Sequence, residues 1–169
     1  MAEAPSVLVT AASKHGATAE IADAIAAELA ANGMSVTRLE PDQVDGVEPY
    51  DAVVLGSAVY AGRWHKDARR LVDDLAGQLE NRAVFLFSSG PIGDPPMPDS
   101  EPVDSAEIVA STSAVDHRVF AGALEQSRLN FGERAIVAAL RAEYGDFRDW
   151  DEIRAWARGI AIRLGSVDG

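Results

Sequence analysis

A short polar segment, SKHGAT, occupies residues 13–18 between an apolar run and a helical pattern. Small, hydroxylated and glycine residues at the start of a helix leave successive backbone N–H groups open to an anion, and the helix dipole favours negative charge there. Ser13 and Thr18 add hydroxyl donors, and Gly16 allows the backbone to close around phosphate oxygens. The segment predicts a phosphate-binding turn; the ordinary alternative is that Ser13 or Thr18 only caps the helix.

Several other kinds of chemistry are excluded. The chain contains neither G-x-x-x-x-G-K-[ST] nor G-x-G-x-x-G. Cysteine is absent, which excludes disulfides, thiolate catalysis and thiolate-bound metals, and the three histidines show no metal-ligand spacing. A phospho-receiver domain needs an acid pair after its first strand and an aspartate ending its third, where this chain has Ala11-Ala12 and Gly56. Anion binding by backbone amides is therefore the chemistry that the first segment supports.

Two further segments suit a flat ligand. Residues 57–62 read SAVYAG, and their small side chains let the backbone approach a ring that Tyr60 or Trp64 could cover. Residues 89–93 read SGPIG, where glycine and proline fix a turn whose amides and carbonyls could bond the polar edge of that ring. The ordinary alternatives are that Trp64 is the first core residue of a helix and that residues 89–93 form a generic turn.

Strands and helices alternate along the chain, which is the pattern of parallel β-α-β units. Five strands in 169 residues predict an α/β protein with a doubly wound, five-stranded parallel sheet of order 2-1-3-4-5 in a three-layer αβα arrangement. The segments after strands one, three and four should then meet at the carboxyl edge of the sheet. The expected strands are 6–11, 34–39, 51–56, 83–88 and 118–122, and the expected helices are 17–32, 64–79, 105–112, 131–142 and one that Asp149 caps, with Glu152 completing a capping box.

The composition indicates one domain over residues 1–169, with a helical insert at about 124–147. No apolar run approaches the roughly 18 residues of a membrane span, and the N-terminus lacks a signal-peptide pattern, so we expect a cytoplasmic protein. The net charge of −12 disfavours nucleic acid and anionic membranes and favours a partner with a basic face. Acidic residues gather at 40–51 and 94–116, either as solvated loops or as a rim around a site.

The three segments resemble those of flavodoxins. SKHGAT is similar to the S/T-x-T-G-x-T phosphate loop of that family, with His15 in place of the usual Thr. GSAVYAG resembles the ring-covering loop, with Tyr60 where many members have Trp, and SSGPIG corresponds to the third loop. The C-terminal half, with VFAGAL and DWDEIRAWARGIA, is similar to the branch related to menaquinone-dependent protoporphyrinogen oxidase. The resemblance covers nearly the whole chain and implies a flavodoxin-like fold.

The resemblance implies FMN as the cofactor. The backbone of the first segment would wrap the phosphate, and the other two segments would sandwich and edge-bond the isoalloxazine ring. No catalytic side chain and no metal ligand is implied. The implied cofactor-binding residues are Ser13, Lys14, His15, Gly16, Ala17, Thr18, Ser57, Ala58, Val59, Tyr60, Ala61, Gly62, Ser89, Gly90, Pro91, Ile92 and Gly93.

Two classes of function follow from these observations. In the first, the protein carries electrons to or from a redox protein that docks through a basic face. In the second, it is a flavoenzyme that oxidises protoporphyrinogen IX or a related substrate, with menaquinone as acceptor. The resemblance favours the enzyme and the charge favours the carrier, since residues 124–147 hold three basic against four acidic residues, whereas the oxidase branch has a longer and more basic insert. The oligomeric state is left open.

Overall fold

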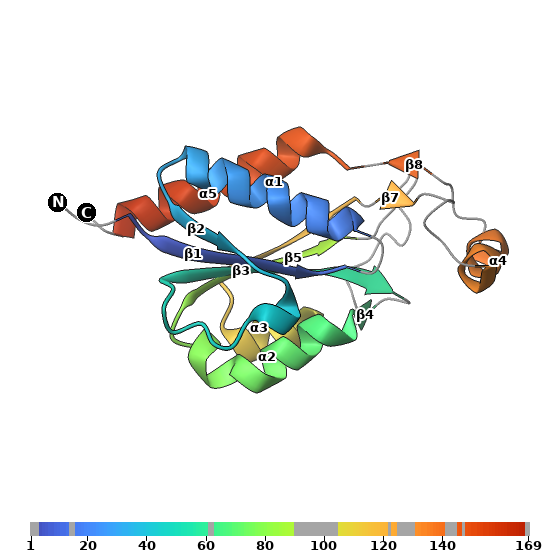
Figure 1. Cartoon of the computed structure of the whole chain (residues 1–169), viewed down its shortest axis with the longest axis horizontal. Helices are drawn as coiled ribbons and strands as arrows, with labels where there is room; N and C mark the ends of the chain where they lie inside the picture. The colour runs from blue at the N-terminus through green and yellow to red at the C-terminus, as the bar shows by residue number, and fades with distance from the viewer. Residues whose placement is uncertain are drawn as a thin grey trace.

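The computed structural model describes residues 4–13, 16–60, 63–89, 105–121, 123–124, 131–140, 145–146 and 148–167. Figure 1 shows a twisted sheet with helices on both of its faces. This confirms the expected α/β class and its three layers.

Five parallel strands form the body of the sheet, in the spatial order β2-β1-β3-β5-β6. Counted without the short β4, these strands follow the expected order 2-1-3-4-5. The central strand β3 is apolar and buried from Ala52 to Leu55, as a strand covered on both faces must be. The bounds are β1 Ser6–Ala12, β2 Ser35–Arg38, β3 Ala52–Tyr60, β5 Ala83–Ser89 and β6 Asp116–Phe120.

A short antiparallel strand, β4 (Arg63–Trp64), makes the sheet six-stranded and corrects the expected start of the second helix. Strand β3 continues to Tyr60 instead of ending at residue 56, and it pairs with β4 through Val59↔Trp64 and Tyr60↔Arg63. The helix α2 (Lys66–Leu79) begins only after this hairpin, with His65 as its N-cap. Trp64 is therefore a buried strand residue rather than the first core residue of a helix.

Two helices cover each face of the sheet, with α1 and α5 on one side and α2 and α3 on the other (Figure 1). Strand alternation builds the two cores, because Val7 and Val9 of β1 face α1 and α5 while Leu8 faces α2. The 3₁₀ turn η1 (Pro41–Gln43) follows β2. The helix bounds are α1 Ala17–Ala31, α3 Ser105–Thr112 and α5 Trp150–Val167.

The expected insert contains a helix, α4 (Phe131–Leu140), and its two ends are joined by a ribbon. The ribbon consists of β7 (Ala123–Leu124) and β8 (Gly145–Asp146), which pair antiparallel through Ala123↔Asp146 and Leu124↔Gly145. In Figure 1 these elements lie at the same end of the molecule as β4. After the ribbon, Asp149 caps α5 as expected, because its Oδ1 accepts the N–H of Glu152 at 3.0 Å.

The last strand of the sheet begins earlier than its apolar pattern indicates. The backbone N–H of Val115 donates to the carbonyl of Val84 at 2.7 Å, so the chain already bonds to β5 before residue 118, where the strand was expected to begin. Asp116 opens the strand and accepts hydrogen bonds from the Trp156 indole at 3.0 Å and from the His117 backbone at 2.9 Å. Strand β6 therefore spans 116–120 instead of 118–122.

We expect Gly56→Ala to destabilise the protein. Gly56 is paired with Phe87 of β5, and a Cβ at Gly56 would lie 2.0 Å from the Phe87 ring. That ring cannot move freely, because its centroid is 6.0 Å from that of Phe120 and 6.1 Å from that of Trp156. The free energy of unfolding should fall by about 1–3 kcal/mol, seen as a lower midpoint in urea denaturation.

The matched control is Gly77→Ala on α2, where no atom lies within 4 Å of an added Cβ. The same substitution should there raise the free energy of unfolding by up to about 1 kcal/mol, because alanine is the better helix former. Equal effects at the two positions would contradict the packing explanation for Gly56.

We expect Asp116→Asn to lower the stability of the folded protein more at neutral pH than at acidic pH. Burial acts to raise the pKa of Asp116, but hydrogen bonds from Trp156 and the His117 backbone, together with Arg118, outweigh it and hold the pKa below its ordinary value. The charged carboxylate therefore adds stability at pH values above about 4, which is lost as the pH falls further. The difference in Tm between wild type and Asp116→Asn should narrow between pH 7 and pH 3, and a constant difference would contradict this assignment.

Candidate functional site at the carboxyl edge of the sheet

The register of the sheet brings the three predicted segments to one edge. Ala12 at the end of β1 pairs with Ser57 of β3, which pairs with Ser88 of β5. Ala58 and Ser89 form the next pair along the same strands. Because the strands are parallel, the chain leaves this row at each position toward the same side of the sheet. The expected convergence of the three segments is thus a property of the strand pairing.

The described residues at the opening of α1 leave the first-turn amides without a side-chain cap. Gly16 is the N-cap with φ 89°, a left-handed conformation that glycine adopts without strain. Within the described residues, no side chain makes a capping hydrogen bond to the first turn of α1. The Ser13 hydroxyl accepts the Gly16 N–H at 2.9 Å, which shapes the turn before the helix rather than capping the helix itself. Thr18 lies buried in the first turn.

An arginine that sequence reasoning missed packs against this opening. Arg148 precedes α5, and its side chain is only 5% exposed. Its Nη1 donates to the carbonyl of Ala17 at 3.2 Å and lies 3.4 Å from Glu20 Oε2. Its Nε and Nη2 donate to the two carboxylate oxygens of Asp146 at 2.9 and 2.6 Å. The guanidinium also lies 4.7 Å from the centroid of the Trp150 ring.

Arg148 thus joins the first turn of α1 to the segment that runs from β8 to the start of α5, more than a hundred residues later in the chain. Its hydrogen bonds to Asp146 and the charge of Glu20 raise its pKa above the ordinary value, although burial acts in the opposite direction. No local pattern signals the contacts with Ala17 and Glu20, because these residues lie 131 and 128 positions away in the sequence.

The hairpin of β3 and β4 is fixed from below by buried polar groups. Trp64 is 2% exposed, and its indole N–H donates to the Ser88 hydroxyl at 2.7 Å. The Ser57 hydroxyl accepts the backbone N–H of His65 at 2.8 Å and donates to the carbonyl of Ala58 at 2.9 Å. The Ser57 side chain therefore holds the base of the hairpin, and Trp64 is an anchor beneath the covering segment rather than its exposed face.

The remaining predicted site residues are partly described. Ala58 and Val59 are half-buried in β3, Tyr60 ends that strand, and Ser89 is buried at the end of β5. Lys14, His15, Ala61, Gly62, Gly90, Pro91, Ile92 and Gly93 lie outside the described residues, as does the side chain of Tyr60.

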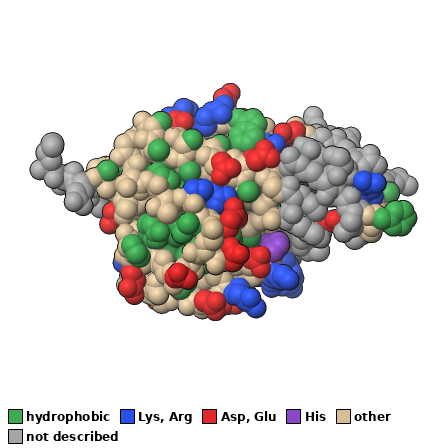
Figure 2. Space-filling view, in the orientation of Figure 1, with side chains coloured by type: hydrophobic (Ala, Val, Ile, Leu, Met, Phe, Trp, Pro, Cys, Tyr) green, Lys and Arg blue, Asp and Glu red, His purple; other side chains and the backbone are tan. Residues whose placement is uncertain are grey.

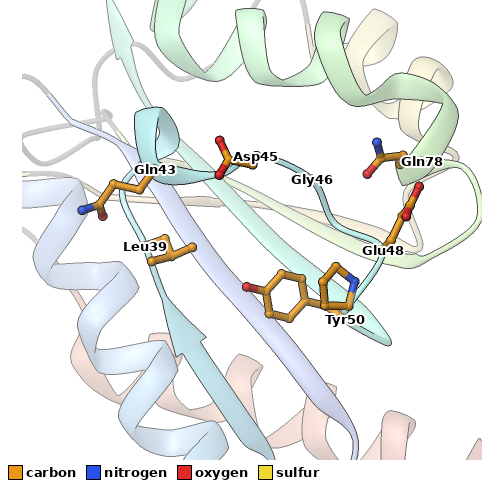
Figure 3. Close-up of a pocket in the computed structure, with 8 residues that line it drawn as sticks. Leu39, Gln43, Asp45, Gly46, Glu48, Tyr50 and Gln78 are labelled. Carbon is orange, nitrogen blue, oxygen red and sulfur yellow. The ribbon is translucent and has the colours of Figure 1, made fainter.

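Three carboxylates of the first acidic run, those of Asp45, Glu48 and Asp51, lie away from this edge. Asp51 accepts the N–H of Ser6, the first residue of β1, at 2.9 Å, which places it at the amino edge of the sheet. Asp45 and Glu48 line a separate groove of about 470 Å³ with Leu39, Tyr50 and Gln78 of α2 (Figure 3). Figure 2 shows acidic side chains spread over the face in view, with basic ones among them. These three carboxylates therefore form no rim around the predicted site.

The described residues of the edge offer amides, hydroxyls and one buried cation, which suit binding of an anionic, planar ligand. Within the same part of the chain, no three histidine, aspartate or glutamate residues are grouped so that they could hold a metal ion. Among the helices that the structure describes, none is long and apolar enough to cross a membrane.

Both the structure and the sequence of this chain are similar to those of known proteins. An archaeal flavodoxin has a similar structure, with a TM-score of 0.67 and 14% identity over 95% of this chain and 99% of its own. Protoporphyrinogen IX dehydrogenase [quinone] of Escherichia coli K12 is 26% identical over 91% of this chain and 93% of its own length.

A shorter match joins the chain to an uncharacterized protein of Methanocaldococcus jannaschii, MJ0298. The two are 33% identical over 75 residues, which is 44% of this chain and 47% of that protein. The chain thus spans about half the length of this relative. Residues 8–151 match the flavodoxin domain, a stretch that includes β1, the candidate edge and the start of α5. The chain therefore belongs to the flavodoxin domain family.

Proposed function

We propose that the protein binds FMN at the carboxyl edge and exchanges electrons with protein partners. The observation that carries this proposal is the opening of α1, where Gly16 leaves the first-turn amides without a side-chain cap beside the row Ala12–Ser57–Ser88. A phosphate dianion suits such amides, because they supply aligned dipoles without losing hydrogen bonds to a competing side chain. Membership of the flavodoxin domain family supports the same assignment.

The residues that would hold FMN follow from the three segments. Residues 13–18 would bind the phosphate through backbone N–H groups, while 57–62 and 89–93 would contact the isoalloxazine ring. The described residues fit this role, because none of their side chains makes a capping hydrogen bond to the first-turn amides of α1. These amides are therefore free of a competing side-chain acceptor. When bound, the flavin supplies one- and two-electron chemistry, and the protein supplies binding, orientation and electrostatics.

The hairpin gives the covering segment a rigid base. Strands β3 and β4 are paired directly before and after residues 61–62, and Trp64 and Ser57 tie both strands to the sheet beneath. A segment held at both ends can keep its backbone in a fixed position relative to the ring of a bound cofactor. A cofactor site requires this kind of preorganisation. This is the positioning role that we assign to Trp64 and Ser88.

The net charge supports docking on a basic partner. A charge of −12 attracts a positively charged protein over distances beyond direct contact and accelerates encounter at low ionic strength. The alternative is oxidation of protoporphyrinogen IX or a related substrate with a quinone acceptor. It is favoured by the likeness to the E. coli quinone-linked dehydrogenase over 91% of this chain and by the insert at the candidate edge (Figure 1).

The cofactor is tested by adding FMN to apoprotein in calorimetry and recording the absorption spectrum. We expect stoichiometric binding, a visible flavin band and release of FMN on denaturation. The function is then tested by reducing the loaded protein and mixing it with a basic c-type cytochrome, whose reduction should slow as salt is raised. Folded apoprotein that does not bind FMN would overturn the proposal, and turnover of protoporphyrinogen with menaquinone would select the alternative.

We expect Trp64→Phe to weaken the binding of FMN and of riboflavin by the same factor. The substitution keeps the ring in the core but removes the hydrogen bond to Ser88, so the hairpin loses an anchor while the phosphate turn is untouched. A net hydrogen bond of about 0.5–1.5 kcal/mol corresponds to a roughly two- to twelvefold loss of affinity. Ser88→Ala removes the same bond from its other side, together with the bond of 2.8 Å between the Ser88 hydroxyl and His117 Nε2, and should weaken both flavins by an equal factor that is at least as large. A loss confined to FMN would contradict this role of Trp64.

A further inference from the structure

We infer that Arg148 is a specificity-determining residue that makes the site prefer FMN over riboflavin. The inference rests on the proposed function, because it concerns the phosphate end of the same site. Arg148 does not belong to any of the three segments from which that site was built. It donates to the backbone carbonyl of Ala17, a residue of the phosphate turn, from a position that is almost closed to solvent.

The charges around the phosphate turn explain why an arginine is needed there. Glu20 lies in the first turn of α1, and Asp146 is held beside it by the ribbon. Together with Arg148 these groups carry a local charge of −1. Without Arg148 these two carboxylates would carry −2, beside the turn in which the phosphate dianion would bind. Lys14 of that turn lies outside the described residues, and its charge is the same in every variant. Arg148 thus offsets one of two carboxylates that would otherwise repel the ligand.

The dipole of α1, like Arg148, favours a bound phosphate. The amino end of a helix carries about half a positive charge, so a guanidinium beside it is opposed in the empty protein. A bound phosphate changes the sign of that interaction, because the dipole and the guanidinium then both face an anion. Riboflavin has the same ring and ribityl chain but no phosphate, so it gains nothing from this change.

Arg148 also has a structural consequence, since it ties β8 and α5 to α1. A purely structural role and an electrostatic role predict different results. If Arg148 only holds elements together, its loss weakens both flavins equally, and loss of its partner Glu20 also weakens binding. If its charge acts on the phosphate, loss of Arg148 weakens FMN alone, and loss of Glu20 strengthens FMN.

The experiment measures the dissociation constants of FMN and riboflavin for apoprotein by flavin fluorescence quenching at about 0.1 M salt. The variants are Arg148→Met, Arg148→Lys, Glu20→Gln and the double variant Glu20→Gln/Arg148→Met. The matched control is Arg158→Met, which removes another ion pair between α5 and α1, 3.4 Å long, at Glu28. Glu28 lies about 12 Å further along α1 than Glu20, beyond the Debye length of about 10 Å at 0.1 M salt.

We expect the preference for FMN over riboflavin to fall about tenfold in Arg148→Met, equivalent to about 1.4 kcal/mol. It should rise by a smaller factor, about threefold, in Glu20→Gln, because Glu20 is partly exposed and screened. Arg148→Lys keeps the charge and should retain most of the preference. The double variant brings the local charge back to −1 and should recover part of the loss, leaving the preference about threefold below wild type. Arg158→Met should equal wild type.

The inference is overturned if Glu20→Gln lowers the preference, or if Arg148→Met weakens both flavins by the same factor. Glu20→Gln keeps the test decisive even where Arg148→Met folds poorly. The two proposals fail differently. Wild-type protein that binds neither flavin removes the proposed function and this inference with it, whereas wild-type protein that binds FMN with a preference unchanged by these variants removes the inference alone.

Discussion

The parallel register of β1, β3 and β5 is the constraint on which the candidate site depends. Hydrogen bonding sets Ala12, Ser57 and Ser88 in one row, so three segments far apart in the chain must leave the sheet side by side. That register has a packing requirement. It places Gly56 against Phe87, whose ring occupies the space that a side chain on β3 would take. Gly56, the first residue of the GSAVYAG segment, therefore serves the packing of the core one residue below the edge.

Two different interactions hold the two halves of the edge. Buried neutral hydrogen bonds, from Trp64 to Ser88 and from His65 to Ser57, fix the hairpin that would cover the ring. A cluster of charges centred on Arg148 holds the turn that would bind the phosphate. Neutral buried bonds vary little with salt, whereas charges at a partly exposed turn are screened. The two ends of the proposed cofactor thus meet surroundings that differ in their physical response, which allows ring binding and phosphate binding to be tuned separately.

The sequence predicted what depends on periodicity and failed where contacts are long-range. The strand order and α1 follow from apolar patterns and from Gly33, and the cap at Asp149 follows from a local motif. Strand β4 was missed because two residues have no period and Trp64 also fits a helical face. Arg148 was missed because its contacts span up to 131 positions in the sequence. The roles of residues 14–15, 61–62 and 90–93 stay predictions, since they lie outside the described part of the chain.

The net charge of −12 is compatible with the anionic cofactor that we propose, because the effect of a charge falls with distance. Asp51 lies before β3, at the amino edge, and the strand from there to Ser57 in the row of the candidate site spans about 20 Å. At physiological salt the Debye length is about 8 Å, so this carboxylate has little effect on a phosphate at the other edge. In our proposal the groups that decide phosphate binding are those beside the first turn of α1, where Arg148 offsets part of the charge of Glu20 and Asp146. The total charge acts instead on the approach of a partner, and so the same chain can attract a basic protein and still hold a dianion.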